Sequence, residues 1–399
     1  MEHPERTRVG IVGAGPAGLL LARHLHMSGI DCVVLESRDR EYVERRQRAG
    51  ILEQGTVEAL RAVGAADRLE REGIPHEGIE LRFSRRSHRV DFPSLTGGRR
   101  VWVYAQTEVV KDLVALQLRE GPPLLFDAPV LAVEGPDTKR PLIRYVHAGR
   151  ERTLTCDWVV GCDGYHGVTR RGLPPGALRT YERTHPYSWF GILADAPPAY
   201  DELIYAHSDR GFALASMRSP HVSRLYLQVP NGTDPDAWSD ARIWDELDAR
   251  FATEGDWRLH RGPIIAKAVL PMRSSVTEPM AWGRVFLAGD AAHIVPPTGA
   301  KGLNLAAADV VVLARAFDHL KVTGSTDLLD AYSDTCLRRV WRAEHFSFFM
   351  TSTLHKAPEQ SEFDTRLQLS QLERITASWH AAAELAENYA GLPMGGKGA

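Results

Sequence analysis

The chain has 399 residues, and because a single hydrophobic core usually stops growing below that length, two closely packed domains are expected. Hydrophobic residues make up 44% and charged residues 25% of the chain, a composition typical of globular proteins. The formal net charge of −3 argues against a polyanionic partner such as nucleic acid.

The cysteines and the first residues predict the compartment. The four cysteines show no CxxC spacing and no adjoining histidine cluster, which favours reduced thiols and no metal site. Charged residues occupy the first positions, so no secretory signal is expected. The apolar runs at 9–23 and 302–317 are too short, or are interrupted by Asp or Arg, to span a membrane. A cytoplasmic protein without a membrane partner is therefore predicted.

The first residues predict a nucleotide-binding unit. Residues 8–12 read as a short buried strand, 16–28 as a helix ending near Gly29, and 32–36 as a second buried strand. Strand, helix and strand within about thirty residues form a right-handed βαβ unit.

The later elements predict an insertion. A helix is expected at 107–120 and a strand at 154–160, and 180–275 alternates as an antiparallel sheet does, with one helix near 240–251. Another buried strand is expected at 284–288, followed by helices at about 302–320, 326–356 and 366–388. The predicted fold is therefore mixed α/β, with a Rossmann-like domain, an inserted antiparallel-sheet domain and C-terminal helices.

A glycine pattern follows the first strand. Gly13, Gly15 and Gly18 form G-x-G-x-x-G at the start of the helix, and Glu36 ends the second strand. The glycines allow a tight turn and close approach to a pyrophosphate, the helix N-terminus favours that anion, and the acid suits a ribose. The pattern predicts an ADP-containing cofactor and does not choose between FAD and NAD.

Two further motifs bear on that choice. Asp290 follows Gly289 at the end of the strand at 284–288, and Asp163 precedes Gly164 after the strand at 154–160. Together with the glycine pattern, these motifs resemble the three fingerprints of the flavoprotein aromatic hydroxylases. The resemblance implies non-covalent FAD, with Asp290 at its ribityl chain and Asp163, with Arg170, near both the flavin and the nicotinamide cofactor.

A Pro-Pro-Thr-Gly loop at 296–299 opens the next predicted helix. The two prolines fix the backbone and remove N–H donors. The helix is expected to begin near Lys301, so its positive end and this lysine would stabilise an anionic reduced flavin.

Longer runs resemble the members of this family that hydroxylate 4-hydroxybenzoate. The runs are 48–55, 76–78, 106–108, 203–206, 211–218, 290–304 and 387–393. By position, the resemblance implies that Ser216, Arg218 and Tyr226 hold the substrate carboxylate. An arginine fork matches a carboxylate in two hydrogen bonds, and hydroxyl groups can complete the shell.

The same resemblance implies a proton path and a set of cofactor contacts. Tyr205 and Tyr389 would contact the substrate phenol, His76 would continue the path to solvent, and the carbonyl of Pro297 would face the hydroxylated carbon. Residues expected at the cofactors are Gly13, Gly15, Ala17, Gly18, Glu36, Arg46, Arg48, Gln106, Asp163, Asp290, Lys301, Gly302, Leu303 and Asn304. The implied FAD-binding domain covers 1–75, 100–180 and 276–320, the substrate-binding domain 76–99 and 181–275, and a helical region 321–399.

The implied reaction is 3-hydroxylation of 4-hydroxybenzoate to 3,4-dihydroxybenzoate with O2 and NADPH or NADH, through a flavin C4a-hydroperoxide, in a homodimer. Arg38 and Arg40 could bind the 2′-phosphate of NADPH, but the donor stays open. Three alternatives remain: a hydroxylase of another phenolic acid such as 3-hydroxybenzoate, a flavin oxidase or dehydrogenase, and a non-catalytic FAD-dependent regulator.

Overall fold

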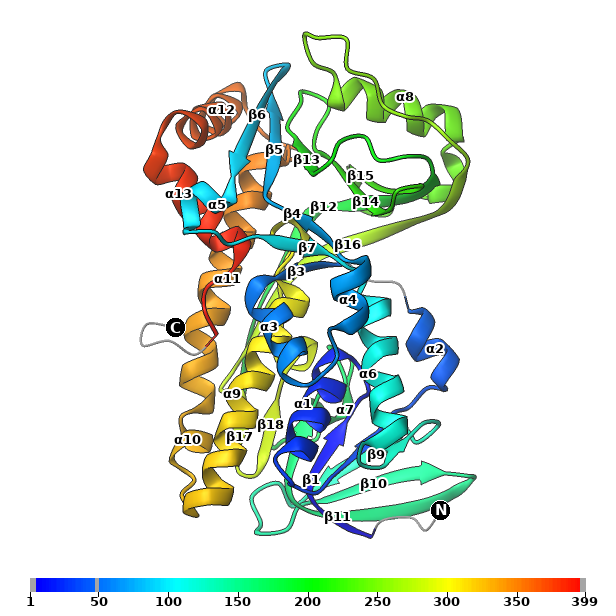
Figure 1. The fold of residues 1–399 in the computed structure, drawn as a ribbon, viewed down its shortest axis with the longest axis vertical. Coiled ribbons are helices and arrows are strands. Elements are labelled where there is room, and N and C mark those ends of the chain that lie inside the picture. Colours follow the sequence, from blue (N-terminus) through cyan, green and yellow to red (C-terminus); the bar gives the residue numbers. More distant parts are fainter. Residues whose placement is uncertain (1–4, 47–49, 395–399) are drawn as a thin grey trace.

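The first of two large sheets carries the nucleotide-binding unit. The structure is a computed structural model that describes residues 5–46 and 50–394 (Figure 1). Strands β8 (Leu124–Leu125), β2 (Cys32–Leu35), β1 (Arg6–Val12), β11 (Arg150–Gly161) and β18 (Val285–Leu287) run parallel in that order. Antiparallel strands β17 (Ala281–Trp282), β9 (Val130–Glu134) and β10 (Leu142–His147) extend it.

Three helices cover this sheet. Helix α1 (Pro16–Met27) packs against α6 (Gln106–Glu120) and α9 (Gly302–Thr323). Val9 and Ile11 of β1 are fully buried, as in a parallel sheet covered on both faces. The predicted βαβ unit and the helices at 107–120 and 302–320 are confirmed within a few residues.

The second sheet is almost entirely antiparallel. Its order is β19 (His293–Ile294), β16 (Ile264–Glu278), β12 (Arg179–Asp195), β15 (Val222–Pro230), β14 (Ala213–Ser219), β13 (Leu203–Ala206), β5 (Gly78–Phe83) and β6 (Arg86–Asp91). Only the pair of β13 and β5 is parallel among its described pairs. Strand β19 lies in the range expected for the first domain yet pairs with β16 of the second sheet. Otherwise the predicted antiparallel insertion is confirmed.

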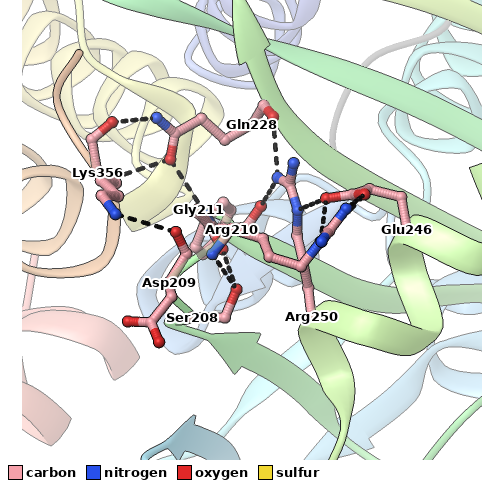
Figure 2. A network of polar contacts seen from close by, with 9 residues as sticks. Ser208, Asp209, Arg210, Gly211, Gln228, Glu246, Arg250 and Lys356 are labelled. Atoms are coloured by element: carbon pink, nitrogen blue, oxygen red, sulfur yellow. Dashed lines mark hydrogen bonds and ion pairs between the residues drawn. The ribbon is translucent and has the colours of Figure 1, made fainter.

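Helices pack on both faces of the second sheet. Ile204, Ala213 and Leu225 face a core shared with α8 (Asp240–Phe251), whereas Tyr205 and Leu214 face a core shared with the C-terminal helices. Buried Arg250 of α8 donates to the carbonyl oxygen of Phe212 and to that of Gln228, and Figure 2 shows the contact with Gln228. One face of the sheet therefore holds α8, and the other is turned toward the remainder of the molecule.

A small sheet joins the two large ones. It consists of β3 (Ile51–Glu53), β7 (Val101–Val103) and β4 (Ile74–His76). Short helix α3 (Gln54–Ala62) contacts β3, and α4 (Asp67–Glu72) precedes β4. Helix α2 (Arg40–Arg45) packs on α6, α5 (Phe92–Thr96) packs on α13 (Trp379–Ala390), and α7 (Val168–Arg171) follows β11. Figure 1 shows this small sheet between the two larger layers.

The C-terminal helices are divided more finely than expected. The helix predicted at 326–356 is α10 (Asp327–Asp330) and α11 (Tyr332–Leu354), and that at 366–388 is α12 (Glu362–Ala377) and α13 (Trp379–Ala390). Ser378 separates the last two, since its hydroxyl accepts the N–H of Ala381 and caps α13. Among the described helices, none is both long and apolar enough to cross a membrane.

Candidate active site

The glycine turn lies between β1 and α1. Gly13 has φ +103°, and a methyl group on Gly18 would lie 2.0 Å from the carbonyl oxygen of Gly13. Both positions therefore require glycine. A methyl group on Gly15 would meet no atom within 4 Å, so the N-terminus of α1, where Ala17 forms part of the first turn, is open to a ligand. This geometry fits a pyrophosphate.

Glu36 stands beside that turn at the end of β2. Its carboxylate accepts the N–H groups of Ala14 at 2.7 Å and Arg38 at 2.9 Å, and the Ser37 hydroxyl at 3.1 Å. A carboxylate has about four acceptor positions. The acid is thus held in place and keeps capacity for a ribose hydroxyl group.

The Gly289–Asp290 turn follows β18. The N–H of Gly289 donates to Oδ2 of Asp309 at 2.9 Å, and Nε2 of His293 lies 2.7 Å from the same oxygen. Burial by itself would lower the pKa of His293, but Asp309 outweighs it and the net shift is upward. This buried pair holds the turn, while the Asp290 side chain is exposed and available to the hydroxyl groups of a ribityl chain.

Asp163 offers an unused acceptor. Its Oδ2 accepts the backbone N–H and the hydroxyl of Thr169, both at 2.9 Å, whereas buried Oδ1 has no partner among the described residues. Burial raises the pKa of this carboxyl group. Arg170 nearby donates to Thr277 and to the carbonyl oxygen of Tyr165. An unsatisfied buried oxygen at the end of β11 fits a bound cofactor.

Lys301 differs from its expected arrangement. Its Nζ lies 2.5 Å from Oε1 of Glu53 and 3.0 Å from the carbonyl oxygen of Tyr389, and the ion pair is buried. Burial lowers the pKa of Lys301, opposed by Glu53. A local carboxylate therefore balances the charge that we expected to act on a flavin.

Asn304 also has partners within the protein. Its Oδ1 accepts the N–H of Glu53 and the hydroxyl of Thr56, and its Nδ2 donates to the carbonyl oxygens of Ile51 and Ala300. These four bonds use the full capacity of the side-chain amide. Asn304 thus ties α9 to β3, and any cofactor contact that it makes would be through its backbone.

The other residues expected at the cofactors lie at the starts of α9 and α6 and after α2. Gly302 and Leu303 are half-buried at the start of α9, where a methyl group on Gly302 would meet nothing within 4 Å. Gln106 begins α6, and Arg46 is exposed after α2. Arg48 lies outside the described residues.

The substrate residues gather on one face of the second sheet. Leu214 pairs with Tyr205 on one side and with Tyr226 on the other, so the two tyrosines lie in one row. The Ser216 hydroxyl donates to the carbonyl oxygen of Arg224 at 3.0 Å. Ser216 and Tyr226 are buried on the same strands.

Arg218 follows on the same strand as Ser216. Burial lowers its pKa, opposed by Tyr226. A methyl group on Gly50 would lie 3.0 Å from Nη1 of Arg218, so the chain before β3 passes close to the guanidinium. The fold therefore brings Ser216, Arg218 and Tyr226 to one region beside the row of tyrosines.

Two buried tyrosines are in direct contact. The hydroxyl groups of Tyr205 and Tyr389 lie 2.7 Å apart, and that of Tyr205 donates to the carbonyl oxygen of Thr298 at 3.2 Å. Both side chains are 1% exposed, and burial raises both pKa values. The structure thus joins residues 184 positions apart into a pair able to pass a proton.

His76 and Pro297 differ in exposure and in their contacts. His76 is fully buried, neither ring nitrogen has a partner among the described residues, and burial lowers its pKa to about 4. It is therefore neutral near pH 7, and the structure shows no hydrogen bond to Tyr389. Pro297 is exposed, and its carbonyl oxygen accepts the N–H of Ala300 at 2.9 Å.

Three contributing residues were not identified from the sequence. Asp309 holds the Gly289 turn, Glu53 pairs with Lys301, and the carbonyl of Thr298 accepts from Tyr205. The interruption of an apolar helical run by Asp309 was a visible signal, since a charged residue there requires a partner. The other two contacts join distant segments and left no local pattern.

Comparisons with known proteins show the family of the chain. A family model described as "FAD binding domain" matches residues 6–347. The p-hydroxybenzoate hydroxylase of Acinetobacter baylyi is 46% identical over 97% of this chain and 96% of its own length. An Escherichia coli 3-(3-hydroxy-phenyl)propionate/3-hydroxycinnamic acid hydroxylase is 26% identical over 79% of this chain and 57% of its own length.

Solved structures show the same fold. The p-nitrophenol 4-monooxygenase PnpA of Pseudomonas putida DLL-E4 has a TM-score of 0.82 at 20% identity, over 96% of this chain and 97% of that one. A complex of aklavinone-11 hydroxylase with FAD and aklavinone has a TM-score of 0.73 at 23% identity, over 91% and 71%. The chain is an FAD enzyme that uses a nicotinamide co-substrate, as is typical of such proteins. It belongs to the FAD-binding family of flavin-dependent aromatic hydroxylases.

Proposed function

We propose that the protein hydroxylates 4-hydroxybenzoate at its 3-position. The reaction consumes O2, NADPH or NADH and a proton, and it yields 3,4-dihydroxybenzoate, NADP⁺ or NAD⁺ and water. The observation that carries the proposal is the buried hydroxyl pair of Tyr205 and Tyr389 on the sheet face that also holds Ser216 and Tyr226. The 46% identity to a p-hydroxybenzoate hydroxylase supports it.

The carboxylate of the substrate would bind a site formed by a cation and two hydroxyl groups. Arg218 carries the charge, and hydroxyl groups of Ser216 and Tyr226 complete the shell. Burial lowers the pKa of Arg218, which reflects the cost of holding this cation away from water. An incoming carboxylate offsets that cost with two charge-assisted hydrogen bonds, so it orients the ring as well as binding it.

The phenol end requires removal of a proton. A phenol has a pKa of about 10, and its phenolate has the more electron-rich ring. Tyr205 receives the substrate proton on its hydroxyl oxygen and passes its own to Tyr389, whose hydroxyl lies 2.7 Å away, once that proton has turned from the Thr298 carbonyl. The ring nitrogens of His76 have no partner among the described residues, so a water molecule could link one of them to the path, although burial lowers the pKa of His76 and makes it a weak base there.

The cofactor residues fit FAD. Gly13, Gly15, Ala17 and Gly18 would hold the pyrophosphate and Glu36 the adenosine ribose. Asp290 and Asp163 would hold the ribityl chain and the flavin side of the site, with Gly302, Leu303, the Asn304 backbone and Gln106 at the ring. FAD supplies hydride acceptance from the nicotinamide cofactor and activation of O2.

The proposal also covers the domain boundaries, the nicotinamide site and the oligomeric state. The FAD-binding domain would comprise 1–75, 100–180 and 276–320, the substrate-binding domain 76–99 and 181–275, and the helical region 321–399. Arg46 and Arg48, with Arg38 and Arg40, would receive the nicotinamide cofactor phosphates. We also propose a cytoplasmic homodimer, which the free state of all four cysteines suits.

The test is nicotinamide oxidation by the FAD-loaded protein, with NADPH and NADH each assayed. Each assay is run without substrate, with 4-hydroxybenzoate and with 3-hydroxybenzoate, and products are identified by chromatography. We expect a rate strongly stimulated by 4-hydroxybenzoate and formation of 3,4-dihydroxybenzoate. Stimulation by 3-hydroxybenzoate alone, or peroxide without ring hydroxylation, would refute the proposed substrate.

A further inference from the structure

The segment that follows α13 is held by basic side chains from three parts of the fold. Residues 391–394, here called the strap, overlap the end of the run 387–393, yet the proposed chemistry uses only Tyr389 of that run. In Figure 1 the red segment after α13 runs down beside α11. Nothing in the proposed reaction by itself requires this segment to be held in place.

Each carbonyl group of the strap accepts a hydrogen bond from an arginine. Arg99, between α5 and β7, donates to Gly391 at 2.9 Å, and Arg315 of α9 donates to Met394 at 3.4 Å. Arg339 of α11 donates twice, to the carbonyl oxygens of Leu392 at 3.2 Å and Pro393 at 2.5 Å. Arg339 therefore makes the central attachment.

The strap begins two residues after Tyr389. The backbone carbonyl of Tyr389 accepts from Lys301, and its ring stacks on Phe92 at 5.1 Å between ring centres. The last turn of a helix has carbonyl groups without intrahelical partners and opens most readily. Attachments immediately beyond that turn therefore limit how far the Tyr389 hydroxyl can move from Tyr205.

Gly391 adds a second, steric indication. It has φ +92°, and a methyl group there would lie 2.1 Å from Oε2 of Glu53. The chain can pass over the buried pair of Glu53 and Lys301 only because this residue has no side chain. The strap is thus seated against the same buried pair that holds the backbone of Tyr389.

We propose that the strap fixes the position of Tyr389 for proton transfer from the substrate, and that Arg339 is a positioning residue acting through it. This inference rests on the proposed proton path through Tyr205 and Tyr389. Arg339 makes no hydrogen bond to either tyrosine among the described contacts. It acts on Tyr389 through the chain at Leu392 and Pro393, and its charge also acts on the buried pair of Glu53 and Lys301.

The test compares Arg339→Met and Arg339→Lys with Arg342→Met in the FAD-loaded protein. Arg342 lies on the same helix but binds the side chain of Asn388 and none of the strap carbonyls in the described contacts. Two quantities are measured: the fraction of bound 4-hydroxybenzoate present as phenolate, by ultraviolet absorbance against pH, and amide hydrogen exchange of residues 385–394.

Arg339→Met should shift the phenolate titration to higher pH, speed exchange in 385–394 and lower kcat by about tenfold or more, since a misplacement of about 1 Å can cost about 100-fold. Arg339→Lys should recover part of each effect, and Arg342→Met should resemble the parent protein. Unchanged exchange and titration in Arg339→Met would overturn the proposal, as would equal effects in Arg342→Met. If the parent protein does not hydroxylate 4-hydroxybenzoate, the proposed substrate fails, whereas the exchange result still decides whether Arg339 holds the helix end.

Discussion

Two cations in the site have different environments. Lys301 is buried and paired with Glu53, whereas Arg218 is half-buried on the substrate face, where Tyr226 opposes the lowering of its pKa by burial. Coulomb attraction strengthens as water is excluded, so a carboxylate ligand gains most from a cation held in such a place. At the scale of single residues, Arg218 is therefore the position where substrate affinity should be most sensitive.

Replacement of Arg218 by lysine tests this difference. Arg218→Lys keeps the charge but loses the fork, and a charge-assisted hydrogen bond contributes about 1.5–3 kcal/mol, so the KM for 4-hydroxybenzoate should rise about 10- to 150-fold. Arg242→Lys is the matched control, because Arg242 lies over the ring of Trp238 beside α8. Steady-state kinetics measure both, and an equal KM in the two variants would exclude Arg218 as the carboxylate ligand.

The hydroxyl of Tyr389 can be removed without disturbing its ring contacts with Phe92 and Phe346. We expect Tyr389→Phe to lower kcat by about 100-fold, the lower end of what a positioned acid–base group contributes. Tyr187→Phe removes the hydroxyl of another buried tyrosine of the second sheet and should leave kcat within about twofold. A Tyr389→Phe enzyme with the parent kcat over pH 6–9 would show that the tyrosine pair carries no proton.

At the scale of elements, a buried arginine adds polar attachments to the apolar packing of α8 on the second sheet. Nε of Arg250 donates to Glu246 at 2.9 Å, and its Nη1 donates to the carbonyl oxygens of Phe212 and Gln228 at 2.8 and 2.9 Å. Figure 2 shows Arg250 with Glu246 and Gln228, and Arg210 beside Arg250 donating to the same Glu246 carboxylate. The arginine thus links the helix to β15 and to the residue that precedes β14.

Replacement of Arg250 should loosen α8. Arg250→Met removes the charged donor from the carbonyl oxygens of Phe212 and Gln228, although the carbonyl of Phe212 keeps the N–H of Gln228 at 2.9 Å. A hydrogen bond from a charged group contributes about 1.5–3 kcal/mol, so the free energy of unfolding should fall by about 2–4 kcal/mol. Arg261→Met, which removes a half-exposed ion-pair partner of Asp245 and Asp248, should cost less than about 1 kcal/mol. Urea denaturation compares them, and similar midpoints would contradict the assigned role of Arg250.

The break between α12 and α13 belongs to the same scale. The apolar periodicity predicted one helix at 366–388, and the structure ends α12 at Ala377 and restarts at Trp379. The helix propensity of Ser378 does not by itself predict a break, but its hydroxyl caps α13 once the chain turns there. The turn lets α13 pack against α5, which puts Tyr389 beside Phe92.

At the scale of the whole molecule, buried histidines set the response to acid. Burial lowers the pKa of His76 to about 4 and that of His355 to about 3, from an ordinary value of 6.5. Below pH 6.5 these two histidines become protonated in the unfolded chain but stay neutral in the folded protein. Each histidine therefore lowers the free energy of unfolding by up to about 1.4 kcal/mol per pH unit as the pH falls. Glu344, whose pKa burial raises to about 7, opposes this between pH 7 and 4.5.

The net expectation is a loss of stability between pH 6.5 and 4, measurable as a falling midpoint in urea. His355→Gln should flatten this dependence, because an amide does not titrate and can replace the ring contacts with Trp189 and Thr351. His380→Gln, in an exposed position on α13, should keep the slope of the parent protein. Identical slopes in all three proteins would show that His355 is not held neutral by the fold.

The sequence by itself determined the βαβ unit, the antiparallel insertion and an ADP-containing cofactor, because strand and helix periodicity and glycine turns are local properties of the chain. The choice of FAD came from the resemblance to a family. Only the tertiary structure decided how the site residues are used. It paired Tyr205 with Tyr389, balanced Lys301 with Glu53, occupied the Asn304 amide and left His76 neutral. Those outcomes depend on burial and on contacts between residues far apart in the chain, which no local pattern records.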